Sequence, residues 1–295
     1  MNLVENFLEY LSSDKGYSPL TIVTYKTDLL TFELFFKSVE EGLEWSTIDS
    51  DIIRRWMAHR MENSISPRTV KRSLSALHSF YRYLMKIHVV SSDPSSKIIN
   101  PKVPKNLPTF VKQDEMDRLF DQIEFKYDFA GMRNRLILLT FYSTGIRLSE
   151  LISLNVRDVD FDRMELKVTG KRNKQRIVPF GRELAEAFEH YLKKSKLLFQ
   201  GGDTPIFITQ KKCKRMKGYQ VRDIVKKYLS LVTTQKKRSP HVLRHTFATV
   251  MLNNGAELEA VKELLGHESL STTEIYTHTT FAEIKKEYQH AHPRA

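Results

Sequence analysis

Residues 239–245, with the sequence SPHVLRH, combine side chains that suit phosphate chemistry. The initial serine and proline are typical of a helix N-terminus, so we expect a helix to begin at His241. At about 100° per residue, His241, Arg244 and His245 lie on one face of that helix. Because a helix N-terminus favours anions, the pattern predicts a phosphate site. Two alternatives stay open: surface histidines on an amphipathic helix, and a zinc site that lacks an evident third ligand.

Two further reactive side chains follow this helix. Gly266 suits the end of a helix, which places His267 at the start of a loop. Residues 271–274 have the Ser-x-x-Glu spacing of a capping box, so Tyr276 is expected in the second turn of a new helix. A tyrosine hydroxyl can act as a nucleophile, although a tyrosine in such a place is more often a core or interface residue.

A second basic pair lies upstream. Arg147 comes just past a glycine turn, where an arginine is often structural and where Glu150 is available as its partner. Lys171 falls at the tip of a predicted hairpin between strands over 164–168 and 175–179. A lysine at such a tip is ordinarily a solvated turn residue. The Gly-Lys pair is no P-loop, because an arginine follows where serine or threonine is required.

The elements that would position these side chains fall into two domains joined by a linker. Residues 1–90 carry four amphipathic helical patterns, which indicate a four-helix bundle. Residues 91–109 contain four prolines and three lysines and are typical of a linker. Residues 110–295 mix helices with the hairpin, and a third strand is expected at 205–208. The helices of this part are expected at 112–123, 131–143, 147–153, 182–197, 218–231, 240–253, 257–265 and 271–287.

The charge distribution favours DNA as a partner. Residues 1–90 hold 11 Lys/Arg and 11 Asp/Glu, which leaves 36 of the 47 basic residues and 24 of the 35 acidic ones beyond residue 90. The whole net charge of +12 therefore lies beyond the first domain. Residues 66–86 are also basic and contain no acid, although one such run is typical of a solvated helix face. A single cysteine and the lack of a membrane-length apolar run indicate a cytoplasmic protein.

Four segments together resemble the tyrosine recombinase (phage integrase) family, and within it the Xer-type recombinases, XerC-like or XerD-like. They are TGIRLSEL at 144–151, TGKRNKQRIVP at 169–179, HVLRHTFAT at 241–249 and LGHESLSTTEIYTH at 265–278. Each is weak alone, but their order and spacing are specific. The resemblance implies a SAM-like core-binding domain followed by a catalytic domain that is mainly α with a small β-sheet (α+β).

The resemblance also implies how the DNA backbone would be cut. Arg147 and Arg244 would clamp the scissile phosphate and stabilise its five-coordinate transition state. Tyr276 would attack phosphorus and hold the 3′ end, and His267 would hydrogen-bond the phosphate.

Two more residues would handle protons. His241 would accept the tyrosine proton or orient the phosphate, and Lys171 would protonate the departing 5′ oxygen. Because one phosphodiester is exchanged for another, the resemblance implies no ATP, no metal and no other cofactor.

The expected partner is double-stranded DNA, held between the two domains. Arg68, Lys71 and Arg72 are expected to contact it from the helix over 66–86. The family implies a tetramer on DNA, homomeric or shared with a paralogous recombinase. It further implies a Holliday junction, chromosome-dimer resolution at cell division, and regulation by a DNA translocase of the division septum. Residues after about 280 are expected to dock on a neighbouring subunit; a mobile-element integrase stays open as an alternative.

Three rival functions differ in what they require. A metal-dependent transposase or nuclease needs clustered carboxylates, whereas the acids here are scattered. A non-catalytic DNA-binding protein explains the charge but leaves the basic positions and the tyrosine without a role. A type IB topoisomerase would share the chemistry and differ in assembly.

Overall fold

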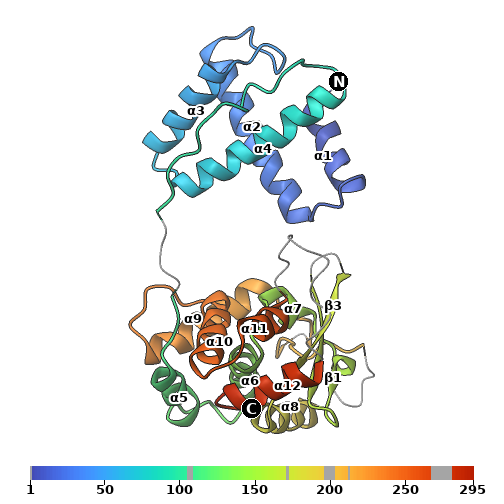
Figure 1. The fold of residues 1–295 in the computed structure, drawn as a ribbon, viewed down its shortest axis with the longest axis vertical. Coiled ribbons are helices and arrows are strands. Elements are labelled where there is room, and N and C mark those ends of the chain that lie inside the picture. The colour runs from blue at the N-terminus through green and yellow to red at the C-terminus, as the bar shows by residue number, and fades with distance from the viewer. Residues whose placement is uncertain (1, 105–108, 171–172, 196–202, 212, 267–280) are drawn as a thin grey trace. The chain divides into compact units, whose positions relative to one another are not determined.

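The computed structural model describes residues 2–104, 109–170, 173–195, 203–211, 213–266 and 281–295 (Figure 1). The chain forms two compact units, Met1–Asn106 and Leu107–Ala295. Helices dominate both, and a small three-stranded sheet lies in the second, so the expected fold class is confirmed. No helix in the described part of the chain has the length and apolar character that crossing a membrane requires.

The first unit is a bundle of four helices. Its helices are α1 (Leu3–Ser13), α2 (Pro19–Val39), α3 (Ser50–Glu62) and α4 (Pro67–Lys86). Serines begin two of them as expected: Ser18 accepts from the Thr21 amide and Ser66 from the Thr69 amide. Helix α2 packs against the other three, and the ring of Phe32 lies 4.9 Å from that of Trp56 in the core.

A buried aspartate ties three of these helices together. Asp28 of α2 is only 1 % exposed and accepts hydrogen bonds from Arg72 Nη2 (2.8 Å) and Ser73 Oγ (2.8 Å) of α4. Arg60 of α3 approaches the same carboxylate at 3.8 Å. The hydrogen bond from Arg72 to Asp28 raises the pKa of Arg72. Asp28 therefore fixes how α2, α3 and α4 pack.

The second unit is built around helix α6 (Phe129–Thr144), in which residues 136–144 are all buried. Helices α7, α8, α9 and α10 pack against it. The remaining elements of the unit are α5 (Gln113–Asp121), α7 (Leu148–Ser153), the 3-10 helix Val156–Asp158, β1 (Val159–Asp160), β2 (Glu165–Thr169), β3 (Gln175–Pro179), α8 (Arg182–Ser195), α9 (Gly218–Val232), α10 (Pro240–Asn253), α11 (Leu258–Leu265) and α12 (Phe281–Ala291). The strands pair antiparallel in the order β1-β2-β3, and β3 contacts α11.

The prediction of a third strand at 205–208 was wrong. Residues 206–208 are buried, but the segment forms only isolated bridges, from Pro205 to Asn155 and from Ile208 to Arg215. The third strand of the sheet is instead the short β1, which pairs with β2 on the edge opposite β3. An apolar run of this length reports burial and does not by itself specify pairing.

The C-terminal residues pack on the unit to which they belong. Helix α12 contacts α10 and α11, and Tyr288 is fully buried. His292 Nε2 donates to the Tyr142 carbonyl (3.1 Å), and burial lowers the pKa of His292 to about 4. Arg294 pairs with Asp121 (2.8 Å) and Glu183 (2.8 Å). The docking of this region on a neighbouring subunit, which the family resemblance implies, stays a prediction.

Candidate active site

Arg147 is the N-cap residue of helix α7 and is held by a buried carboxylate. Its backbone N–H donates to Glu150 Oε2 (2.6 Å) and its Nη1 to Glu150 Oε1 (2.8 Å), so the ion pair expected from the sequence is present. Its Nη2 donates to the Gly266 carbonyl (2.7 Å) at the end of α11. The Arg147 side chain is 39 % exposed, which leaves the guanidinium accessible to a ligand.

Arg244 reaches the same place from α10. Its Nη1 donates to the Gly145 carbonyl at the end of α6 (2.7 Å), and its Nη2 to the Leu265 carbonyl at the end of α11 (2.6 Å). The residue is buried, which differs from the open cationic face expected from the sequence. Burial, and then repulsion by Arg147, lowers the pKa of Arg244 to about 10, so it stays charged at neutral pH.

Glycines at both helix ends make these carbonyls available. Gly145 has φ +60°, and an added Cβ would lie 2.5 Å from the ring of Phe247. Gly266 has φ +62°, and an added Cβ would lie 3.1 Å from the guanidinium of Arg176. Both positions favour glycine because of conformation and of space. Each glycine lets an arginine approach the negative end of a helix closely.

A third arginine, Arg176 of β3, completes the group and was not among the residues expected from the sequence. Its Nη1 and Nη2 donate to the two Glu150 oxygens (2.8 and 3.0 Å), and its Nε donates to the Leu264 carbonyl (2.8 Å). One signal was available: side chains alternate along a strand, and Arg176 lies on the same face as buried Val178. An arginine at an inward strand position requires a partner.

We call Arg147, Arg176, Arg244 and Glu150 the arginine cluster. Burial would raise the pKa of Glu150, but hydrogen bonds from Arg176 and from the Arg147 amide lower it to about 2. Among the described residues the cluster thus holds three guanidinium groups against one carboxylate, a surplus of two positive charges. Excess positive charge in a partly buried place favours binding of an anion.

The two histidines of α10 lie close together. His241 Nε2 and His245 Nε2 are 3.1 Å apart, and the ring centroids are separated by 4.4 Å. His241 is exposed, while burial, together with the charges of His241 and Arg244, lowers the pKa of His245. In the ranges that the structure describes, no three His, Cys, Asp or Glu residues are grouped so that they could hold a metal ion.

The other expected site residues divide into two groups. Lys171, His267 and Tyr276 lie outside the described residues. Arg68 and Lys71 are exposed on α4 of the first unit. Arg72 is exposed as well, but two of its N–H groups are held by Asp28.

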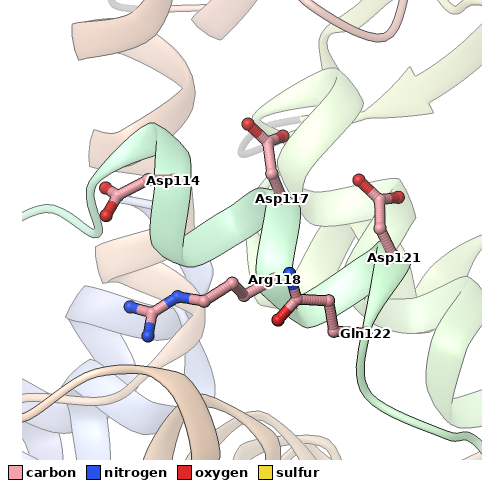
Figure 2. A pocket seen from close by; sticks show the side chains of 5 residues that line it. All are labelled: Asp114, Asp117, Arg118, Asp121 and Gln122. Carbon is pink, nitrogen blue, oxygen red and sulfur yellow. The ribbon is translucent and has the colours of Figure 1, made fainter.

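A hollow of about 490 Å³ lies apart from the arginine cluster, on helix α5 (Figure 2). Its lining is Asp114, Asp117, Arg118, Asp121 and Gln122. Figure 2 shows the carboxylates of Asp117 and Asp121 on one side of the helix, with Arg118 directed elsewhere. The lining holds three carboxylates and one arginine, and Arg294 pairs with two of these carboxylates, so the acids still outnumber the arginines and the hollow does not suit the DNA backbone.

Comparisons with known proteins show the family of this chain. Residues 109–283 match the model of the phage integrase family, and residues 4–88 match the phage integrase N-terminal SAM-like domain. A tyrosine recombinase XerC of Chlorobaculum parvum is 37 % identical and covers 99 % of this chain and 94 % of its own length. For XerC of Bacillus subtilis the values are 36 %, 100 % and 97 %. The XerH site-specific recombinase bound to its difH substrate has a similar fold, with TM-score 0.70 and 24 % identity over 96 % of this chain and 83 % of that chain.

Proposed function

The chain belongs to the phage integrase family and is a site-specific tyrosine recombinase, an enzyme that acts on DNA, and we propose that it does so through a covalent 3′-phosphotyrosyl intermediate at Tyr276. The observation that carries this proposal is the arginine cluster. Two cations, the accessible Arg147 and the buried Arg244, converge on adjacent carbonyls of one helix end. A phosphate bound there would offset the burial and the repulsion by Arg147, which together lower the pKa of Arg244.

Two of the remaining catalytic residues are bonded directly to residues of this site. His267 follows Gly266, whose carbonyl binds Arg147. Lys171 follows Gly170, where an added Cβ would lie 3.4 Å from Glu150 Oε1. These neighbours support the roles of His267 as a phosphate ligand and of Lys171 as the general acid.

The proposed reaction conserves the number of phosphodiester bonds. The Tyr276 oxygen forms a bond to phosphorus while the bond from phosphorus to the 5′ oxygen breaks. His241 takes the tyrosine proton, Lys171 supplies a proton to the 5′ oxygen, and Arg147 and Arg244 stabilise the added negative charge. A 5′-hydroxyl of another strand then reverses the step. Neither a metal ion nor ATP is needed for this sequence.

We extend the proposal to assembly and cellular role. Residues 1–90 would grip duplex DNA, residues 91–109 would link, and residues 110–295 would catalyse. Because Asp28 holds Arg72, we expect Arg68 and Lys71 to supply the stronger phosphate contacts of α4. We propose further, from the family resemblance, that the chain resolves chromosome dimers in the cytoplasm at cell division, as a homo- or hetero-tetramer regulated by a septal DNA translocase; the relatives named tyrosine recombinase XerC support the placement within the Xer-type recombinases.

The test begins with duplex sites selected from random DNA by binding to the protein. A selected duplex with a nick beside the cleavage position traps the intermediate, because the short fragment diffuses away. We expect a covalent protein–DNA adduct in EDTA, its loss in Tyr276→Phe, and its persistence in Tyr219→Phe, which alters an exposed tyrosine of α9. An adduct that survives Tyr276→Phe, or one that requires magnesium, contradicts the proposal.

A further inference from the structure

Arg176 occupies a junction between three parts of the second unit. It belongs to β3, it binds Glu150 of α7 through both terminal nitrogens, and it binds the Leu264 carbonyl of α11 through Nε. Its side chain is 16 % exposed, less than half the exposure of Arg147. All three of these hydrogen bonds are 3.0 Å or shorter. The guanidinium fork is therefore committed to protein groups and is not directed at a ligand.

The contact with Glu150 determines how much charge Arg147 retains. Glu150 Oε1 accepts from both Arg147 Nη1 and Arg176 Nη1, each at 2.8 Å. With Arg176 in place, one carboxylate is shared by two cations, and Arg147 keeps charge for an anion. Without Arg176, Glu150 becomes a counter-ion for Arg147 alone and competes with any phosphate.

The contact with Leu264 determines where α11 ends. The carbonyls of Leu264, Leu265 and Gly266 each accept from a different arginine of the cluster. Arg176 also fills the space beside Gly266, since an added Cβ there would meet its Nη1, Cδ and Cζ at 3.1–3.2 Å. The chain that continues to His267 and Tyr276 therefore leaves α11 from a point fixed by Arg176.

We propose that Arg176 is a positioning residue for DNA cleavage: it holds Arg147 and the end of α11 in register with each other and does not touch the phosphate. This inference rests on the proposed phosphotyrosyl mechanism. Its strongest support is that one guanidinium joins β3, α7 and the end of α11. Arg147 directly precedes α7, and the chain that leaves the end of α11 continues to His267. Lysine cannot replace it, because an ammonium group lacks the planar fork that spans both Glu150 oxygens and Leu264.

The test compares Arg176→Lys with a matched control, Arg135→Lys, which alters another half-buried arginine paired with a glutamate (Arg135 to Glu183, 2.7 Å). Both variants are measured for DNA affinity and for the single-turnover rate of adduct formation on the nicked duplex. We expect Arg176→Lys to slow cleavage about 100-fold, a loss typical of a misplaced catalytic group, with DNA affinity nearly unchanged. Arg135→Lys should cleave at the wild-type rate. Equal rates for Arg176→Lys and wild type overturn the inference.

A sulfur-substituted substrate distinguishes positioning of Arg147 from positioning of the general acid. When the bridging 5′ oxygen is replaced by sulfur, the leaving thiolate needs no proton because a thiol has a pKa of about 8.5. Lys171→Ala should recover on this substrate, whereas Arg176→Lys should stay slow. Recovery of Arg176→Lys assigns its effect to proton transfer and contradicts the inference.

A double-substitution cycle gives a result that does not depend on how much of the Arg176→Lys protein is folded. Activity is normalised to protein that binds DNA, and Arg176→Gln serves as a second variant. Because Arg176 acts in part through Arg147, the loss in Arg147→Lys/Arg176→Lys should be smaller than the product of the two single losses. Losses that multiply in the double variant contradict the inference. Failure of the proposed function itself has another signature, because wild type then forms no Tyr276-dependent adduct.

Discussion

Two buried carboxylates, Asp28 in the first unit and Glu150 in the second, are each 1 % exposed and each hold arginines, yet they do different things. Asp28 binds side chains that belong to packed helices of one bundle. Glu150 binds Arg147 and Arg176, whose other N–H groups reach the carbonyls at the end of α11. The first acid fixes how helices cross, whereas the second fixes where chain segments with reactive residues begin.

Asp28 and Glu150 also differ in how much positive charge surrounds them. Around Asp28 two arginines face one carboxylate, and the nearer of them makes a bidentate pair. Around Glu150 a third arginine, Arg244, adds charge from α10, and its guanidinium donates to the main-chain carbonyls of Gly145 and Leu265. A buried acid with arginines is therefore no sign of catalysis by itself; within the described residues, the feature that favours a phosphate is the gathering of three guanidinium groups at helix ends around one carboxylate.

The largest expected effect separates the arginines of the two sites. Arg147→Ala and Arg244→Ala should each slow adduct formation about 100- to 1,000-fold, because each removes a donor to the transition-state phosphate. Arg72→Ala, which disrupts the Asp28 pair, should leave the single-turnover rate within about threefold of wild type at saturating DNA. Rapid-quench measurement of the adduct checks this. Equal losses for Arg72→Ala and Arg147→Ala would remove the distinction between the two acids.

Lowering the pH should reduce the free energy of unfolding of the second unit, because Glu150 becomes protonated. The pKa of Glu150 is lowered from 4.5 to about 2 in the folded chain, so its contribution is present above pH 4.5 and is lost as pH falls toward 2. The free energy of unfolding of wild type should exceed that of Glu150→Gln above pH 4.5, and this excess should fall by about 3 kcal/mol as the pH falls toward 2. Hydrogen exchange of α6 amides reports this unit. A constant difference across the window contradicts the role given to Glu150.

Asp28→Asn provides the matching control. Both tryptophans, Trp45 and Trp56, lie in the first unit, so their fluorescence follows the unfolding of that unit alone. We expect Asp28→Asn to lower the unfolding midpoint seen by fluorescence and to leave α6 exchange unchanged.

A pair of glycines gives a smaller contrast in stability. Gly145 and Gly16 both have φ +60°, but Gly145 is crowded by Phe247 whereas nothing lies within 4 Å of the position where Gly16 would carry a Cβ. Gly145→Ala should therefore cost about 2–4 kcal/mol, combining backbone strain with overpacking, and Gly16→Ala about 1 kcal/mol. Urea unfolding followed separately in each unit checks this. Equal costs would mean that space at the end of α6 is unimportant.

The smallest effects belong to the exposed cations of α4. Arg68→Ala and Lys71→Ala should each reduce the slope of log affinity against log salt by about 1, without changing the cleavage rate of bound DNA. Glu62→Ala, at the end of α3, is an exposed control expected to leave the slope unchanged. Titrations at several salt concentrations give the slope. An unchanged slope in both cationic variants places the DNA contacts elsewhere.

Local signals in the sequence were enough to predict most helices and one ion pair. Serines with prolines marked the starts of α2 and α4, and the spacing of Arg147 and Glu150 within one turn predicted their pairing. The strand predicted at residues 205–208 is absent from the described sheet, because a buried segment and a paired strand have the same apolar pattern in the sequence.

Contacts between distant segments were beyond such signals. Arg176 lies 88 residues from Leu264 in sequence, and Arg244 lies 99 residues from Gly145. The burial of Arg244 follows from the packing of α6, α10 and α11, which helical periodicity does not specify. The family resemblance gave the expected roles of the reactive residues, and the structure added how Arg147 and Arg244 are held.

The central claim is that the surplus charge of the arginine cluster exists to balance the scissile phosphate. A duplex with a methylphosphonate at that position tests it most directly, since replacing one non-bridging oxygen by a methyl group removes the negative charge. Wild type should prefer the phosphodiester, whereas Arg147→Ala and Arg244→Ala should regain cleavage on the neutral substrate, with Arg72→Ala behaving as wild type. If the two cluster variants discriminate between the substrates just as wild type does, the cluster does not neutralise that phosphate.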